Sequence, residues 1–515
     1  MKKIIQLLVV AIVGTTGNIY AQSGIYAGDA LRFSRTDYGS SSRFKGLGNA
    51  QISLGGDISS ISGNPAGLGM FTRSEFSVTP ELDNTKANSN YLGQNTKSTK
   101  TQFNLNNAAA VWYNPVIKPR GSDLNKGLLS VVYGIGYNRT NDFSSSYNYS
   151  GNNPKSSIAD AFAEQANGTT PGNLSGIAGQ AYDSFLIDKQ LGTTNQYYPA
   201  TSLNNTQTQR EVRQGSTSEL DFSAGMNISN KLYLGASIGF VDVRYESNKQ
   251  YTESGTIISN PSNAASTDNS DHANPYVGSN YNLNYSSYQN TTGSGINARL
   301  GIIYKPTSIL RVGATFQAPT WMHMEEDYSE ILNSNITGTS ANPAGTTSNN
   351  DFLNSSFNYN VRTPYKGSLG ASVILGKNAL ISADVDYVNY ASTRLSESDG
   401  YGDLIDENNA YIKQNYTHAF NYRVGGEYRI QSFSIRAGYG VNGSPYKGDD
   451  NNTFDVKYYS AGLGYRIGMY YMDIAYQRTT THNTFSPYEL NDFSEPIATT
   501  KLDKNNMFLT VGVRF

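Results

Sequence analysis

Apolar and polar residues alternate along most of this chain with a period of two, which is the pattern of a β-strand with two unlike faces. In the run near 308–318, one face carries Leu310, Val312, Ala314, Phe316 and Ala318. The opposite face of that run is polar or glycine, and the runs near 379–388 and 432–441 repeat the division. The pattern therefore predicts an all-β protein whose strands separate an apolar from a polar environment.

About fourteen such runs can be placed, an even number of the kind found in single-chain bacterial outer-membrane barrels. They lie near 72–81, 101–113, 128–138, 218–228, 231–246, 292–304, 308–319, 366–375, 379–390, 418–429, 432–441, 455–466, 469–478 and 504–515. An even number of strands places both ends of the chain on the same side of the barrel. We therefore expect an antiparallel transmembrane β-barrel of about 14 strands.

The connections between these runs fall into two classes. Short ones occur near 229–230, 306–307, 376–377, 430–431 and 467–468, and the connection near 114–127 is longer than these. Long ones lie near 139–217, 247–289, 321–354, 391–416 and 480–503. Outer-membrane barrels have short periplasmic turns and longer extracellular loops, whereas a soluble β-sandwich has no reason to sort its loops in this way.

The two ends of the chain carry export and insertion signals. Lys2 and Lys3 precede an apolar run up to Val13, and small residues follow as far as Ala21, which predicts a signal peptide at 1–21 that is cleaved near Ala21. The last run alternates up to the terminal Phe515. A closing strand of this kind resembles the signal read by the bacterial barrel-insertion machinery, so we expect that machinery as a partner and the Gram-negative outer membrane as the location.

Composition supports a barrel over a helical membrane protein. Hydrophobic residues make up only 37% of the 515 residues, while Tyr (39) and Gly (50) are abundant. Beyond the N-terminus no stretch approaches the roughly 18–20 apolar residues of a membrane-spanning helix. The chain has no Cys, which removes disulfides and thiolate metal sites, and a net charge of −2 gives no case for nucleic acid.

Residues 22–71 do not follow the strand pattern and predict a compact plug ahead of a barrel formed by 72–515. They contain Gly46-Leu47-Gly48-Asn49-Ala50, Gly55-Gly56-Asp57-Ile58-Ser59-Ser60 and Asn64-Pro65-Ala66-Gly67-Leu68. These motifs resemble the N-terminal hatch of the FadL/TodX family of outer-membrane transport proteins, in the branch often labelled hemin receptor. The motifs cover about fifty residues, and the strand count extends the likeness to the whole chain.

The resemblance implies a fourteen-stranded barrel, plugged by a hatch, that takes up long-chain fatty acids or other hydrophobic molecules passively. It also implies release through a lateral opening in the wall into the membrane. Only Asn64, Pro65 and Ala66 match the hatch motif well enough to be carried over as gate elements. A tight turn before the first strand explains the same Asn-Pro pair.

Two long loops are candidates for first binding of a ligand. The loop at 139–217 contains apolar spacing typical of short helices near 158–163 and 177–191. The segment 321–332 carries the candidate ligand-binding residues Trp321, Met322, Met324 and Tyr328, and Met suits a surface that accepts varied ligands. Packing of the loops on each other explains these residues equally well.

The sequence shows no pattern for catalysis, and we expect no enzyme, no cofactor and no metal. The four histidines, His272, His323, His418 and His482, are isolated in the sequence. Only His323 is a candidate hemin ligand. An outer-membrane lipase or protease would use His418 with Asp384 or Asp386, but inward polar residues are usual in any barrel.

Three functions remain open at this point. The leading one is uptake of hydrophobic small molecules by a barrel that works as a monomer in outer-membrane lipid. The second is a non-transporting subunit of an outer-membrane secretion or insertion complex. The third, a porin for polar solutes, is disfavoured by the hatch motifs. Apolar residues leading from the hatch to a gap in the wall would favour transport, and a filled barrel without a gap would favour assembly.

Overall fold

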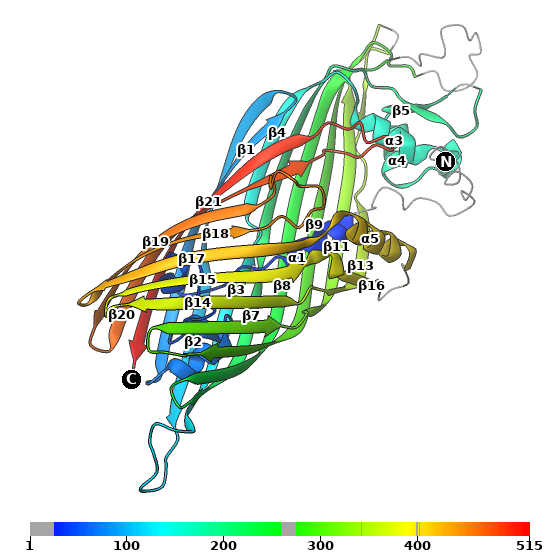
Figure 1. Ribbon diagram of the computed structural model, residues 1–515. Coiled ribbons are helices and arrows are strands. Elements are labelled where there is room, and N and C mark those ends of the chain that lie inside the picture. Colours follow the sequence, from blue (N-terminus) through cyan, green and yellow to red (C-terminus); the bar gives the residue numbers. More distant parts are fainter. Residues whose placement is uncertain (1–24, 191, 259–273, 341, 398–399, 401) are drawn as a thin grey trace, which may run out of the picture.

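The computed structural model describes residues 25–190, 192–258, 274–340, 342–397, 400 and 402–515. The expected signal peptide at 1–21 and His272 lie outside these residues. Within them the chain forms one long barrel with the C-terminus at one end and helices α3 and α4 at the other (Figure 1).

Fourteen wall strands can be followed around the described part of the barrel, and every neighbouring pair is antiparallel. They are β1 (Glu75–Tyr91), β2 (Gln94–Pro115), β3 (Leu128–Asp142), β7 (Asn205–Ile228), β8 (Leu232–Thr256), β9 (Asn280–Tyr304), β10 (Leu310–Gln317) with β11 (Trp321–Ile336), β14 (Lys366–Leu375) with β13 (Leu353–Arg362), β15 (Ala379–Asn389), β17 (His418–Ile430), β18 (Phe433–Asn442), β19 (Val456–Ile467), β20 (Tyr470–Phe485) and β21 (Ala498–Arg514). Strand β1 pairs with β21 and closes the barrel. All fourteen predicted runs overlap one of these strands, so the predicted fold class is confirmed.

Shorter elements lie at the extracellular end and inside the barrel. The remaining strands are β4 (Ser145–Asn153), β5 (Ile187–Lys189), β6 (Tyr197–Pro199), β12 (Thr346–Ser348) and β16 (Arg394–Glu397). The helices are α1 (Ile25–Ser34), α2 (Ser42–Gly46), η3 (Ile58–Ile61), η4 (Pro65–Met70), α3 (Ile158–Ala166), η5 (Pro171–Asn173), α4 (Gly176–Asp183), η7 (Tyr390–Ser392) and α5 (Gly402–Asn415). Among the described residues, no helix has the length and apolar character needed to cross a membrane.

Several strands are longer than the alternation predicted. Strands β8 and β9 stay paired up to Thr256 and Asn280, inside the range 247–289 that we expected to be a loop. Strand β11 likewise occupies much of the expected loop 321–354. The outer faces of these extensions are mostly polar, so the apolar outer face that marked the predicted runs does not continue there although the backbone still forms a ladder. Backbone pairing, not side-chain polarity, decides where these strands end.

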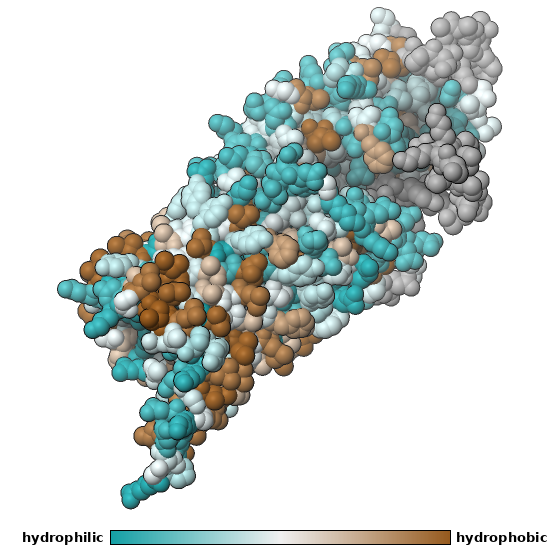
Figure 2. Space-filling model, viewed as in Figure 1, coloured by the Kyte–Doolittle hydropathy of each residue, from teal (hydrophilic) through white to brown (hydrophobic). Residues whose placement is uncertain are grey.

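The exterior carries an apolar band around the end with the short turns, which is the periplasmic end in outer-membrane barrels. Figure 2 shows this band as brown patches, with a mostly polar surface beyond it. Tyrosines predicted to stand at its edges are all outward and at least 37% exposed: Tyr422, Tyr428, Tyr459, Tyr465, Tyr470 and Tyr476. An amphipathic ring suits the headgroup level of a membrane, so these residues form the expected girdle.

The N-terminal segment lies inside the barrel. Helix α2 contacts β18–β21, whereas η4 contacts β3 and β7–β9. Nearly all residues from Tyr38 to Gly69 are buried. We use the name hatch for residues 36–71, which occupy the lumen at the level of the apolar band, and treat α1 separately because it packs nearer the extracellular end.

Candidate functional site

The hatch motif is fixed to the barrel wall through Asn64. Its side chain caps η4, with Oδ1 accepting from the Ala66 N–H at 3.1 Å. The same side chain donates from Nδ2 to the carbonyl of Ile52 at 2.6 Å and of Ile302 on β9 at 3.3 Å. Asn64 therefore joins two parts of the hatch and a wall strand at once. A turn alone would need only the first of these bonds.

Lumen-facing glycines make room for this motif. A Cβ on Gly301 would lie 2.0 Å from Asn64 Oδ1, and a Cβ on Gly235 would lie 2.2 Å from the carbonyl carbon of Pro65. A Cβ on Gly225 would meet Leu68 Cβ at 2.7 Å. Contacts under 3 Å cannot be accommodated without movement, so glycine on β7, β8 and β9 is what lets η4 lie directly against the wall.

Glycines on β10 and β18 seat the first half of the hatch in the same way. A Cβ on Gly438 of β18 would lie 2.1 Å from the backbone nitrogen of Gly48. A Cβ on Gly313 of β10 would lie 2.3 Å from the Ile52 carbonyl oxygen. The hatch therefore touches the wall on several sides of the lumen, and its closure of the lumen stays a prediction.

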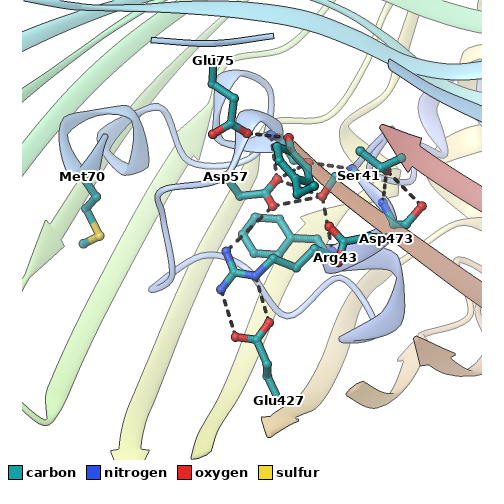
Figure 3. Close-up of polar contacts among 12 residues, drawn as sticks. Ser41, Arg43, Asp57, Met70, Glu75, Glu427 and Asp473 are labelled. Carbon is teal, nitrogen blue, oxygen red and sulfur yellow. Dashed lines mark hydrogen bonds and ion pairs between the residues drawn. The ribbon is translucent and has the colours of Figure 1, made fainter. Parts of the chain in front are cut away.

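A buried ion-pair network holds α2 to the wall (Figure 3). Arg43 Nε lies 3.0 Å from Glu427 Oε2 on β17, and Arg43 Nη1 lies 3.8 Å from Asp57. Arg436 connects the same Glu427, at 2.7 Å, to Asp473 at 2.5 Å. Burial alone would lower the pKa of Arg43, but Glu427 and Asp57 raise it above its ordinary value. The guanidinium is therefore always charged.

The four residues proposed for first ligand binding lie on strand β11, and the structure does not bring them together. Trp321 is 52% exposed on the outside of the barrel. Met322 and Met324 face the lumen in one buried cluster with Tyr26 of α1. The Tyr328 hydroxyl lies 3.3 Å from that of Tyr285. Helix α1 covers the inner face of this strand, a contact that sequence spacing gave no means of seeing.

The other proposed binding loop, 139–217, contains both expected short helices, α3 and α4. Their apolar faces are buried in a cluster with Tyr251 and Tyr281. Glu253 of β8 accepts from Ser157 at 2.5 Å and from both tyrosine hydroxyls at 2.6 Å. Packing between loops accounts for these apolar residues.

A cavity of about 800 Å³ lies in the lumen on the extracellular side of the hatch. Its described lining includes eleven aromatic side chains, among them Tyr147, Tyr245, Tyr416, Phe485 and Phe508. It also includes six cations against three carboxylates: Arg32, Arg35, Lys45, Arg139, Arg213 and Lys504 against Asp37, Glu81 and Asp142. The residues that line the chamber thus combine apolar rings with more cationic than carboxylate side chains.

Arg35 differs from the other cations of this chamber. Arg139 lies 2.7 Å from Asp142, Arg213 lies 2.6 Å from Glu211, and Lys504 lies 3.3 Å from Asp142. No carboxylate among the described residues forms an ion pair with Arg35. Arg35 follows α1 in the segment between α1 and the hatch, so an unpaired guanidinium stands at the boundary between chamber and hatch.

One wall of the chamber is a seam without a backbone ladder. Strand β2 pairs with β3 only from Asn107 to Pro115, and its residues 94–106 pair with β1 alone. A bulge between Arg139 and Asn141 bends β3, and β4 beyond it pairs only with β7. Side chains bridge the seam: the Thr96 and Ser98 hydroxyls donate to the carbonyls of Asn148 and Ser146.

The seam adjoins both the chamber and the apolar band. Asn106 and residues 139–143 line the chamber from inside. On the outer face of β2, Phe103 is 74% exposed and Leu105 is 41% exposed. A stretch of wall held by side chains alone therefore separates the chamber from the exterior at the edge of the apolar band. Alternation could not reveal it, because residues 94–102 of β2 are polar on both faces.

The residues that the sequence offered as catalytic or hemin-binding candidates make other contacts. Asp384 Oδ2 accepts from the N–H groups of Gln51 at 2.6 Å and Ile52 at 2.9 Å, so it holds the hatch. Asp386 pairs with Arg423 at 2.6 Å. His323 and His418 are exposed on the outer face, away from the chamber. The described residues contain no cluster of His, Asp and Glu suited to a metal.

The C-terminal residue lies at the periplasmic end of the barrel. Strand β21 ends at Arg514, and the Phe515 N–H donates to the Ser74 carbonyl at 3.0 Å. The Phe515 ring is 63% exposed. Its role as an insertion signal remains a prediction.

Known proteins resemble this chain in structure and not in sequence. No protein-family model matches the sequence. No curated protein matches it either. A Pseudomonas aeruginosa FadL homologue superimposes with a TM-score of 0.51 at 13% identity, over 92% of this chain and 98% of that chain. The P. putida toluene transporter TodX gives 0.50 at 13% identity, over 93% and 99%.

A deltaS2 mutant of the TodX monoaromatic hydrocarbon channel gives a TM-score of 0.52 at 12% identity, over 93% of this chain and 99% of that chain. At this level of identity the likeness shows the fold, and it confirms the fold expected from the FadL/TodX resemblance. The chain is therefore an antiparallel β-barrel with the architecture of these channels.

Proposed function

We propose that this barrel takes up hydrophobic small molecules, above all those carrying an acidic group, and releases them sideways into the outer membrane. The fold it shares with a FadL homologue and a toluene transporter supports uptake of a hydrophobic compound. The observation that carries the proposal is the chamber, which lies between the hatch and the wall seam and contains the unpaired Arg35.

The chamber's chemistry favours an amphipathic acid over a neutral hydrocarbon. Each CH₂ that leaves water gains roughly 0.8 kcal/mol, so the aromatic lining retains an alkyl or aromatic body. A carboxylate buried without a partner would cost several kcal/mol, and Arg35 offers it a charge-assisted hydrogen bond. Long-chain fatty acids and aromatic acids combine the two features.

Release through the seam explains why the hatch can stay in place. The hatch is tied to the wall through Asn64 and by the Arg43 network, so displacing it would cost several buried contacts. Parting the seam breaks a few side-chain bonds and no backbone ladder. An apolar solute gains nothing from a wet channel, whereas this route leads from the chamber directly to lipid.

The test uses a reversible lock on the seam. The chain has no Cys, so Ser98→Cys with Ser146→Cys introduces one disulfide across it. In liposomes loaded with a fatty-acid-binding fluorescent protein, we expect oxidation to stop delivery of palmitate and reduction to restore it. The matched control, Asp242→Cys with Ser294→Cys, joins two directly paired residues of β8 and β9 and should change nothing. Unchanged delivery in the oxidised seam variant would exclude lateral release at this site.

The accessory-subunit alternative makes a different prediction. A barrel that serves only as part of an assembly needs neither a chamber nor an incomplete wall, and both are present here. If purified protein binds no fatty acid or aromatic acid and delivers none to liposomes, while it co-purifies with other envelope proteins, the assembly role replaces the transport role.

A further inference from the structure

One periplasmic connection is unlike the others. Residues 116–127 join β2 to β3 as a twelve-residue hairpin, whereas the longest of the other described turns on this side is 305–309. In Figures 1 and 2 the hairpin projects beyond the rest of the periplasmic end and away from the barrel's long axis. Turns of two to five residues suffice to connect neighbouring strands, so closing the barrel does not require this extension.

The hairpin exposes apolar and cationic side chains together. Ile117 is 94% exposed and Leu124 is 72% exposed. The exposed fraction of Ile117 is the highest among the large hydrophobic residues that the structure describes. The cations are Lys118, Arg120 and Lys126, and the only carboxylate is Asp123, which lies 3.5 Å from Lys126. A net charge of about +2 therefore accompanies two apolar side chains that the protein itself does not cover.

The positive surface continues along the rim of the barrel. The base of the hairpin is bonded to the next turn, since Gly127 N–H donates to Ser229 Oγ and Ser229 N–H to the Gly127 carbonyl, both at 2.9 Å. That turn contains Lys231, whose carbonyl accepts from the N–H of Lys305 in the following turn at 2.7 Å. The three neighbouring connections, 116–127, 229–231 and 305–309, thus form one cationic edge.

The position of this edge indicates what it meets. On β2 the apolar band ends at Trp112, which is 47% exposed, only a few residues before the hairpin. The hairpin therefore leaves the barrel at the headgroup level of the periplasmic leaflet. Apolar side chains flanked by Lys and Arg are suited to that interface, because the apolar parts enter the acyl boundary while the cations bind anionic headgroups.

We propose that hairpin 116–127 is a lipid-binding arm. It inserts Ile117 and Leu124 into the periplasmic leaflet and binds anionic phospholipid headgroups through Lys118, Arg120 and Lys126. The lipid binding stands independently of the proposed transport. Because the arm connects β2 to β3, and the seam lies beyond the β2–β3 ladder, between β2 and β4, the arm places bound lipid beneath the proposed exit. This last step rests on the proposed function.

The experiment places one reporter on the arm of the full-length protein. Leu124→Cys in this Cys-free chain takes an environment-sensitive fluorophore, and the labelled barrel is reconstituted into equal mixtures of phosphatidylcholine and phosphatidylglycerol or into phosphatidylcholine alone. We expect a blue-shifted emission and quenching by acyl-brominated lipid in the mixture. Both effects should be largely lost in phosphatidylcholine and in the Lys118→Glu, Arg120→Glu, Lys126→Glu variant. A label at Asp450→Cys, in an exposed extracellular loop, should stay accessible to aqueous iodide throughout.

Each other outcome overturns the proposal. If the Leu124 label stays open to iodide and unquenched by brominated lipid, the arm does not bind lipid. If the label is shielded in native outer-membrane vesicles but not in pure lipid, the arm binds a protein instead. A difference in gel mobility between unheated and boiled samples confirms that each variant is folded. Since no ligand takes part, failure of palmitate delivery cannot cause any of these results.

Discussion

The Asn64 side chain occupies the space that Gly301 leaves empty, since a Cβ on Gly301 would lie only 2.0 Å from Asn64 Oδ1. The hatch motif and the wall strand are therefore complementary. Asn64 makes its wall bond to the carbonyl of Ile302, the next residue along β9. The fit implies that side chains on the wall, and not only those of the hatch, determine whether the lumen is closed.

Gly301→Ala should unseat the hatch without disturbing the barrel. Overpacking costs about 1–3 kcal/mol when backbone or a tightly bonded side chain must move, and here Asn64 would lose its wall contact. We expect single-channel conductance in planar bilayers to rise clearly above that of the wild type. Gly367→Ala on β14 is the matched control, because nothing lies within 4 Å of its Cβ position. Equal conductance in both variants would show that this contact does not close the lumen.

Glu427→Gln should weaken the attachment of α2. The substitution leaves Arg43 and Arg436 buried with less negative charge, and breaking a buried pair in this way costs about 3–5 kcal/mol. We expect the amides of residues 41–49 to lose their protection from hydrogen exchange at a lower temperature than in the wild type. The melting temperature of the barrel should change less. Arg244→Gln removes an exposed ion pair with Asp242 and should have almost no effect.

Docking of α1 should depend on pH through Glu326. This residue lies beyond Trp321 on the extracellular side of the apolar band, and burial, with Asp29 of α1 next, raises its pKa from 4.5 to about 7. Gln289 Nε2 donates to both carboxylates, at 2.7 Å to Glu326 and 2.8 Å to Asp29, and Arg32 pairs with Asp29.

Because the docked state holds the proton on Glu326 more tightly, its stabilisation is complete below pH 4.5 and is lost as the pH rises to about 7. The total change is at most about 3 kcal/mol. We expect the protection factors of α1 amides, corrected for intrinsic exchange, to fall across this range. The Glu326→Gln variant should show no such dependence, and a persisting dependence would assign the effect to another group.

Arg35→Gln should change which ligand the barrel binds. Loss of a charge-assisted hydrogen bond is worth about 1.5–3 kcal/mol, so the Kd for palmitate should rise about tenfold or more. The Kd for a neutral hydrocarbon such as toluene should change little, because the aromatic lining is intact. Isothermal titration with both ligands on detergent-purified protein measures this, and equal losses for the two would contradict a head-group role for Arg35.

The hatch shows how much of the site local sequence determines. Asn64-Pro65-Ala66 was recognised as a motif, and its local turn follows from the capping Asn and the Pro after it. Its seating depended on Gly225, Gly235 and Gly301, three glycines on three strands that no sequence spacing relates. The placement of the proposed binding residues was also beyond the reach of spacing: Trp321 and Met322 are neighbours in sequence but face opposite sides of the wall.

By itself the sequence determined the fold class, the number of wall strands and the sorting of turns from loops, because alternation and turn residues are local and repeat in every strand. Only the tertiary structure decided the lengths of the strands beyond the apolar band, the chamber beside Arg35 and the seam between β2 and β4. These depend on which backbone groups of distant segments meet and on what fills the lumen. Alternation reports the environment of each strand face and carries no information about its partner across the barrel.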